Sequence, residues 1–91
     1  MIGPHHILFY DYVEDVLERR GPYREEHLAR FTAAKEAGLV VAAGALGDPP
    51  TGAAAVLAGD ISAVEALVAG DPYVVNGLVT AWRVVPWNVV V

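Results

Sequence analysis

The apolar residues of this chain fall into short runs separated by glycine, proline and charged residues. Aromatic and β-branched residues over 5–13 predict a first strand. The runs "LVVAAGAL" (39–46) and "AAAVLAG" (53–59) flank the turn sequence "GDPPTG" and predict a hairpin. The run "LVTAWRVV" (78–85) predicts a last strand, which Pro86 either ends or confines to a sheet edge.

Two segments between these strands have helical patterns. The segment 22–38 begins with proline, has acidic residues in its first turns and stops at Gly38, which predicts a helix. In "SAVEALV", Ser62 is followed three residues later by Glu65, the pattern of a capping box that opens a second, shorter helix. The charged segment 14–21 is expected to be a polar bridge before the first helix.

The predicted order is strand, helix, strand, strand, helix, strand, a βαββαβ pattern. This pattern indicates an α+β fold of the ferredoxin-like type, with an antiparallel sheet and both helices on one face, in a single domain over 1–91. The strands do not alternate apolar and polar residues, so both sheet faces are expected to be covered. We therefore expect the free face to pack on a second copy, giving a homodimeric α+β barrel or a higher oligomer. The alternative is that small residues such as alanine are tolerated on a wet face.

Composition narrows the classes of function. Of 91 residues, 55% are hydrophobic and 19% charged, which favours contact of apolar surface with another subunit. The formal charge of -5 and six Lys and Arg residues argue against a nucleic acid partner. The same balance argues against a polybasic membrane anchor, and no apolar run is long enough to span a membrane. The start of the chain does not read as a signal peptide, so a cytoplasmic location is expected.

Metal and cofactor sites are not expected. There is no cysteine, which excludes thiol nucleophiles and cysteine-based metal sites. His5 and His6 are adjacent on a predicted strand and would point to opposite faces, so they do not suit one metal ion. No glycine-rich phosphate loop and no Gly-x-Ser-x-Gly motif occurs.

The remaining candidates for chemistry are Arg24, His27 and Asp71. Arg24 and His27 are three residues apart and project from one helix face. Asp71 follows the second helix, which runs beside the first in this fold. If Asp71 accepts a hydrogen bond from one ring nitrogen of His27, it fixes the tautomer and makes the other nitrogen a better base. Each residue also has an ordinary role: Asp71 as a helix cap before Pro72, His27 as a packing residue, and Arg24 on a solvated face.

Three segments together resemble the YciI-like (YCII-related) family, in order over nearly the whole chain: "REEHLARFTAAKEAGLVVAAGAL", "SAVEALVAGDPYVVNGLV" and "RVVPW". The most specific matches are Arg24-x-x-His27, Gly44 and Asp71-Pro72-Tyr73. The resemblance implies a ferredoxin-like fold that dimerises through its sheets, with His27 and Asp71 in a pocket near the dimer core. Two local departures stand out, because family members often carry Gly-Pro at the end of the second strand, where this chain has Gly44-Ala45, and Arg-Pro-x-His where it has "REEH".

The resemblance also implies an activity. One branch of the family removes chloride from a chlorinated hydroxyhydroquinone without a cofactor, and related dimeric barrels include lactone isomerases and small monooxygenases. We therefore expect a cofactor-independent lyase, isomerase or dehydrochlorinase, with His27 as general acid or base and Asp71 as its orienting partner. Expected contacts to a small-molecule substrate come from Arg24, Tyr73, Tyr10 and Gly44. The alternatives are a non-catalytic binding or sensing module, and a structural oligomerisation domain.

Overall fold

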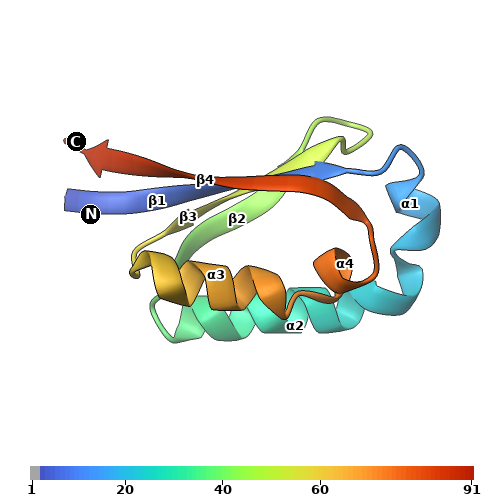
Figure 1. Cartoon of the computed structure of the whole chain (residues 1–91), viewed down its shortest axis with the longest axis horizontal. Coiled ribbons are helices and arrows are strands. Elements are labelled where there is room, and N and C mark those ends of the chain that lie inside the picture. The colour runs from blue at the N-terminus through green and yellow to red at the C-terminus, as the bar shows by residue number, and fades with distance from the viewer. Residues whose placement is uncertain (1–2) are drawn as a thin grey trace.

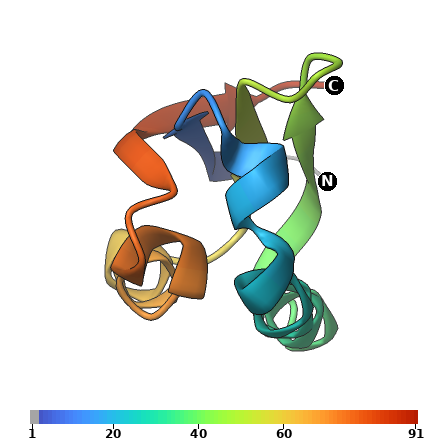
Figure 2. The ribbon, with the colours of Figure 1, turned by 90° about the vertical axis from the view of Figure 1, so that its right-hand side faces the viewer.

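The computed structural model describes residues 3–91 and has a four-stranded antiparallel sheet in the order β2-β3-β1-β4. Its helices lie on one face of that sheet (Figures 1 and 2). The elements in chain order are β1 (Gly3–Tyr12), α1 (Val16–Arg19), α2 (Gly21–Glu36), β2 (Val40–Leu46), β3 (Gly52–Leu57), α3 (Ile61–Ala69), α4 (Pro72–Val75) and β4 (Val79–Val89). The predicted α+β class and ferredoxin-like strand order are confirmed.

Three local predictions differ from the structure. The helix α3 is capped by Asp60, not by Ser62, because the helix begins two residues earlier than a Ser62 cap requires; the Asp60 carboxylate accepts from the Ala63 amide (3.0 Å) and the Ser62 hydroxyl (2.8 Å). The polar bridge contains a helical turn, α1, anchored by the buried Val16. β4 extends beyond the predicted 78–85, through Pro86 to Val89, and the alternative that Pro86 confines the strand to a sheet edge is confirmed, because β4 is the edge strand next to β1.

The core lies between the sheet and α3. It combines buried residues of β1, β2, β3 and α3: Leu8, Tyr10, Val40, Ala55, Leu57, Val64, Leu67 and Val68. The longer helix α2 has no fully buried residue. None of the helices in residues 3–91 is long and apolar enough to cross a membrane.

The sheet beneath α2 is built from alanines. Register places Ala43 and Ala45 of β2 opposite Ala55 and Ala53 of β3, and these pairs share the face of the buried Ala55. Because methyl groups are short, they leave space between α2 and this part of the sheet. Close packing is seen instead at Gly52, where a Cβ would collide with the carbonyl of Tyr10. The small residues thus bring β3 against β1 and keep a hollow under α2.

The second face of the sheet, called the open sheet face below, is not covered by any helix (Figure 2). Alternation from the buried Leu8 and Tyr10 assigns apolar side chains of three strands to it: Ile7, Phe9, Ala54, Val56 and Val85. Arg83 lies on this face with its guanidinium carbon 4.4 Å from the centre of the Phe9 ring. The sequence pattern that predicted two covered faces therefore corresponds to one covered face and one apolar open face in a single chain.

Candidate functional site

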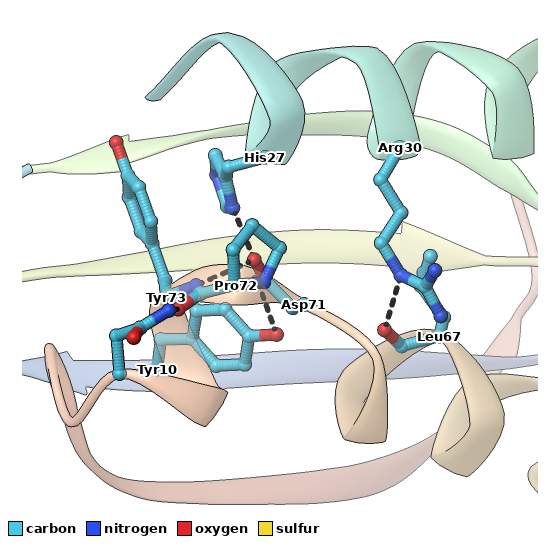
Figure 3. Close-up of polar contacts among 8 residues, drawn as sticks. Tyr10, His27, Arg30, Leu67, Asp71, Pro72 and Tyr73 are labelled. Atoms are coloured by element: carbon cyan, nitrogen blue, oxygen red, sulfur yellow. Dashed lines mark hydrogen bonds and ion pairs between the residues drawn. The ribbon is translucent and has the colours of Figure 1, made fainter. Parts of the chain in front are cut away.

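Asp71 connects α3 to α4 and is fully buried. It is the N-cap of α4, with Pro72 in the first turn, and its Oδ1 accepts the Tyr73 amide at 3.0 Å. The same oxygen lies 2.7 Å from His27 Nδ1, and Oδ2 accepts the Tyr10 hydroxyl at 2.8 Å (Figure 3). The predicted hydrogen bond to His27 is therefore present, and it is made by the oxygen that also caps the helix.

His27 projects from the middle of α2 with 12% of its side chain exposed. Its ring stacks on Tyr73 at a centroid distance of 3.7 Å and an angle of 4°, and the Phe31 ring lies 4.9 Å away. Because an ionised Asp71 can only accept, Nδ1 carries the hydrogen and donates it. Nε2 then has the free lone pair and bonds to no atom within residues 3–91. The histidine is thus held in one orientation and one tautomer.

Tyr10 is the third member of this network. Burial, followed by the charge and hydrogen bond of Asp71, raises the pKa of Tyr10 far above its ordinary value near 10. The hydroxyl therefore remains protonated at any physiological pH and donates to the carboxylate. Asp71 accepts from a backbone amide, a histidine and a phenol, which compensates the burial of its charge.

Arg30 sets the position of the loop that carries Asp71. Its Nε donates to the carbonyl of Leu67 at 3.0 Å, at the C-terminal end of α3 (Figure 3). Its Nη2 donates to the carbonyl of Ala66 at 2.9 Å. A Cβ at Gly70 would collide with this guanidinium. The contact ties α2 to the end of α3, so the element that carries His27 and the loop that carries Asp71 are held together.

A pocket of about 360 Å³ lies between α2 and the alanine floor of β2 and β3. Five of the residues predicted for the site line it: Tyr10, Arg24, His27, Gly44 and Tyr73. Asp71 does not line the pocket and stands behind His27. A Cβ on Gly44 would meet no atom within 4 Å, so packing within one chain does not require a glycine there.

Sequence reasoning missed several lining residues, of which Arg20 and Tyr12 carry polar groups at the end of the pocket near the start of α2. A signal for Arg20 was present, since it precedes Arg24 by one helical turn. Burial and the neighbouring Tyr73 raise the pKa of Tyr12 to about 12, with Arg20 acting in the opposite direction. The Tyr73 hydroxyl is itself buried with no hydrogen-bond partner within residues 3–91. The sequence pattern carries no sign of these hydroxyl positions.

The described part of the chain has no group of three or more His, Cys, Asp or Glu side chains close enough to hold a metal ion. His5 is buried, at 8% exposed, whereas His6 is part-buried and its Nδ1 has no partner among the described residues.

Comparison with known proteins identifies the fold and the family. The structure resembles that of 5-chloro-2-hydroxyhydroquinone dehydrochlorinase from Burkholderia phenoliruptrix, in complex with 2,5-dihydroxybenzoquinone, with a TM-score of 0.76. The match covers 92% of this chain and 93% of that chain at 22% sequence identity, which shows a common fold. No curated protein matches the sequence. The family model of the YCII-related domain matches residues 5–88, nearly the whole chain, and the protein therefore belongs to the YCII-related domain family.

Proposed function

We propose that the protein is a cofactor-independent enzyme that transfers a proton on a small oxygenated substrate, with His27 as the general base and acid. The observation that carries the proposal is the arrangement of His27, whose Nδ1 is bonded to a fully buried carboxylate while its ring lines the pocket. A histidine held in this way has one free nitrogen of defined direction, which is what proton abstraction near neutral pH requires.

In the proposed reaction, the Nε2 lone pair of His27 takes a proton from a carbon next to an oxygenated carbon of the substrate. The electrons of the broken C–H bond form an enolate or phenolate, and Asp71 stabilises the imidazolium through the 2.7 Å contact. Arg24 binds an oxygen of the substrate, either the enolate or a carboxylate. In a lyase the electrons then expel a leaving group such as chloride, and His27 loses its proton to water. In an isomerase His27 returns the proton to a different carbon.

The dehydrochlorinase of similar fold supports the choice of reaction class. Its ligand and its named substrate are oxygenated six-membered rings. The pocket under α2, at about 360 Å³, lies near the lower end of the size range of small-molecule sites and suits a compound with one ring. Chlorinated hydroquinones and small lactones are therefore the first compounds to test.

The test compares the parent with His27→Asn. Turnover is followed by chloride release and by deuterium incorporation from D₂O, read by NMR. Loss of a general base is expected to lower kcat/KM by about 10² or more. Glu26→Gln is the matched control, because it changes a neighbouring exposed residue of α2 outside the pocket. Equal turnover by folded His27→Asn and parent would refute the role of His27, whereas saturable binding with no product would favour the binding or sensing module.

We also propose that the open sheet face forms a homodimer, with two sheets enclosing a common core. Support comes from its apolar composition and from the absence of any helix over it in residues 3–91 (Figure 2). Sedimentation velocity should give the mass of two chains for the parent and of one chain for Val56→Glu, which places a charge on that face. Ala33→Glu, on the exposed side of α2, should remain a dimer. A monomeric parent would contradict the proposal.

A further inference from the structure

The pocket has a cationic end at the beginning of α2. Arg20 and Arg24 both line it. The backbone of Arg20 is helical (φ -74°, ψ -19°), so the two side chains leave the chain one turn apart on the same side. Lys35 lines the pocket near the C-terminal end of α2, where its ammonium donates to the carbonyl of Val41 at 2.7 Å. Among the described residues, Arg20 and Arg24 have no such hydrogen-bond partner.

Within residues 3–91, no carboxylate forms an ion pair at this end of the pocket. None of the residues that line the pocket is Asp or Glu, and within residues 3–91 neither Arg20 nor Arg24 forms an ion pair. The adjacent Arg19, by contrast, lies 3.8 Å from Asp15. Like charges one turn apart on a helix repel each other. In a chain with 11 acidic and only 6 basic residues, two unpaired arginines that share a pocket are complementary to an anion.

A hydrogen-bond donor stands beside the two arginines. Tyr12 lines the same pocket, and its hydroxyl has no partner within residues 3–91. Its ring centre is 6.0 Å from that of Tyr73, and Tyr73 stacks on His27 at 3.7 Å. Tyr12 is therefore linked to His27 through the intervening ring of Tyr73, and all three residues line the same pocket as the two arginines. A ligand that fills the pocket would contact both the cationic end and His27.

We propose that Arg20, Arg24 and Tyr12 form a carboxylate-binding subsite, and that the substrate carries a carboxylate on the ring that reacts at His27. This inference rests on the proposed function and narrows its substrate class. A planar guanidinium matches a carboxylate in two parallel hydrogen bonds, and a phenol adds a third. The alanine floor of the pocket accepts the apolar body of the ring, while the two arginines hold it in one direction relative to Nε2.

The subsite can be tested by binding alone, with benzoate and benzamide as probes of equal size and different charge. Isothermal titration or NMR shift titration at low salt should show that the parent binds benzoate about ten-fold more tightly than benzamide. Arg20→Gln and Arg24→Gln should each weaken benzoate binding about three- to ten-fold and leave benzamide binding unchanged. Arg19→Gln is the control, because it removes the same charge from a residue that does not line the pocket.

The outcome separates this inference from the proposed reaction. His27→Asn should keep the preference for benzoate, because the subsite does not use the base. If the parent binds benzoate no better than benzamide, or if Arg19→Gln weakens benzoate as much as Arg20→Gln, the subsite is refuted whatever the turnover. If the preference and its arginine dependence hold while no substrate reacts, the subsite stands and the catalytic proposal fails.

Discussion

Replacement of Tyr10 by phenylalanine tests the buried network with the removal of one oxygen atom. The Tyr10 hydroxyl donates to Asp71 Oδ2 at 2.8 Å, and both residues are at most 2% exposed. A hydrogen bond to a buried charged group contributes about 1.5 to 3 kcal/mol. Asp71 Oδ1 keeps both of its donors in the variant, so we expect a loss near the middle of this range, about 2 kcal/mol. A chain of this length has a free energy of unfolding of roughly 5 to 14 kcal/mol, so the variant should fold.

Urea denaturation followed by circular dichroism measures this loss. With a slope of about 1 to 1.5 kcal/mol per molar urea, the unfolding midpoint should fall by about 1.3 to 2 M. Tyr23→Phe is the matched control, because the Tyr23 hydroxyl makes no hydrogen bond within residues 3–91. The double variant Tyr10→Phe/Asp71→Asn should lose about 1 kcal/mol less free energy of unfolding than the sum of the two single variants, since Asp71→Asn already removes the charge that strengthens the hydrogen bond. The role of the Tyr10 hydrogen bond would be refuted if Tyr10→Phe lowered the free energy of unfolding by an amount within 0.5 kcal/mol of the Tyr23→Phe control and if the effects of Tyr10→Phe and Asp71→Asn were additive.

Three further changes test the pocket and its tyrosines. Ala45→Leu extends a side chain from the exposed part of β2 into the pocket, so the affinity for benzoate in calorimetry should fall at least about ten-fold with no loss of thermal stability. An unchanged affinity would contradict the assignment of the alanines of β2 and β3 as the floor of the pocket. The pKa of Tyr12 is raised to about 12 in the folded protein, so a tyrosinate absorbance component near pH 12 should disappear in Tyr12→Phe. The unfolded chain loses this proton near pH 10, so the contribution of Tyr12 to stability is complete below pH 10 and declines as the pH rises through 12. Tyr73→Phe removes a buried hydroxyl that has no partner within residues 3–91, so the free energy of unfolding in urea should stay unchanged or rise by up to about 1 kcal/mol; a loss above 1 kcal/mol would show that the hydroxyl is bonded.

The predicted strands and helices were recognisable because their signals are local. The hairpin turn, the proline at the start of α2 and the apolar runs each lie within one short segment. The Ser62 cap was wrong for the same reason, since Asp60, two residues earlier, starts the helix at Ile61 and caps the Ala63 amide, and the pattern of a capping box does not weigh that rival. The turn of α1 has no periodicity of its own and depends on the packing of Val16 against Tyr73 and Leu78, which are distant in sequence.

The His27 and Asp71 pair was predictable because the fold places α2 beside the end of α3. The order of elements is enough to bring the two residues close, and the family resemblance identified which acid and which histidine to pair. The cationic end was not predicted, because Arg20 lies in a segment interpreted as a polar bridge. The four-residue spacing from Arg20 to Arg24 places both side chains on one side only if the backbone at the junction of α1 and α2 is helical, and the predicted helix began after that junction.

The shared oxygen of Asp71 has an evolutionary consequence. Because Oδ1 both starts α4 and holds His27, selection for folding alone would retain the acid in a protein that had lost its reaction. Folding does not require His27 in the same way, since its side chain is partly exposed and another packing residue could replace its ring. An Asp-Pro-Tyr sequence is therefore a marker of the scaffold, and if His27 is the general base as proposed, its presence or loss should separate active members from inactive ones.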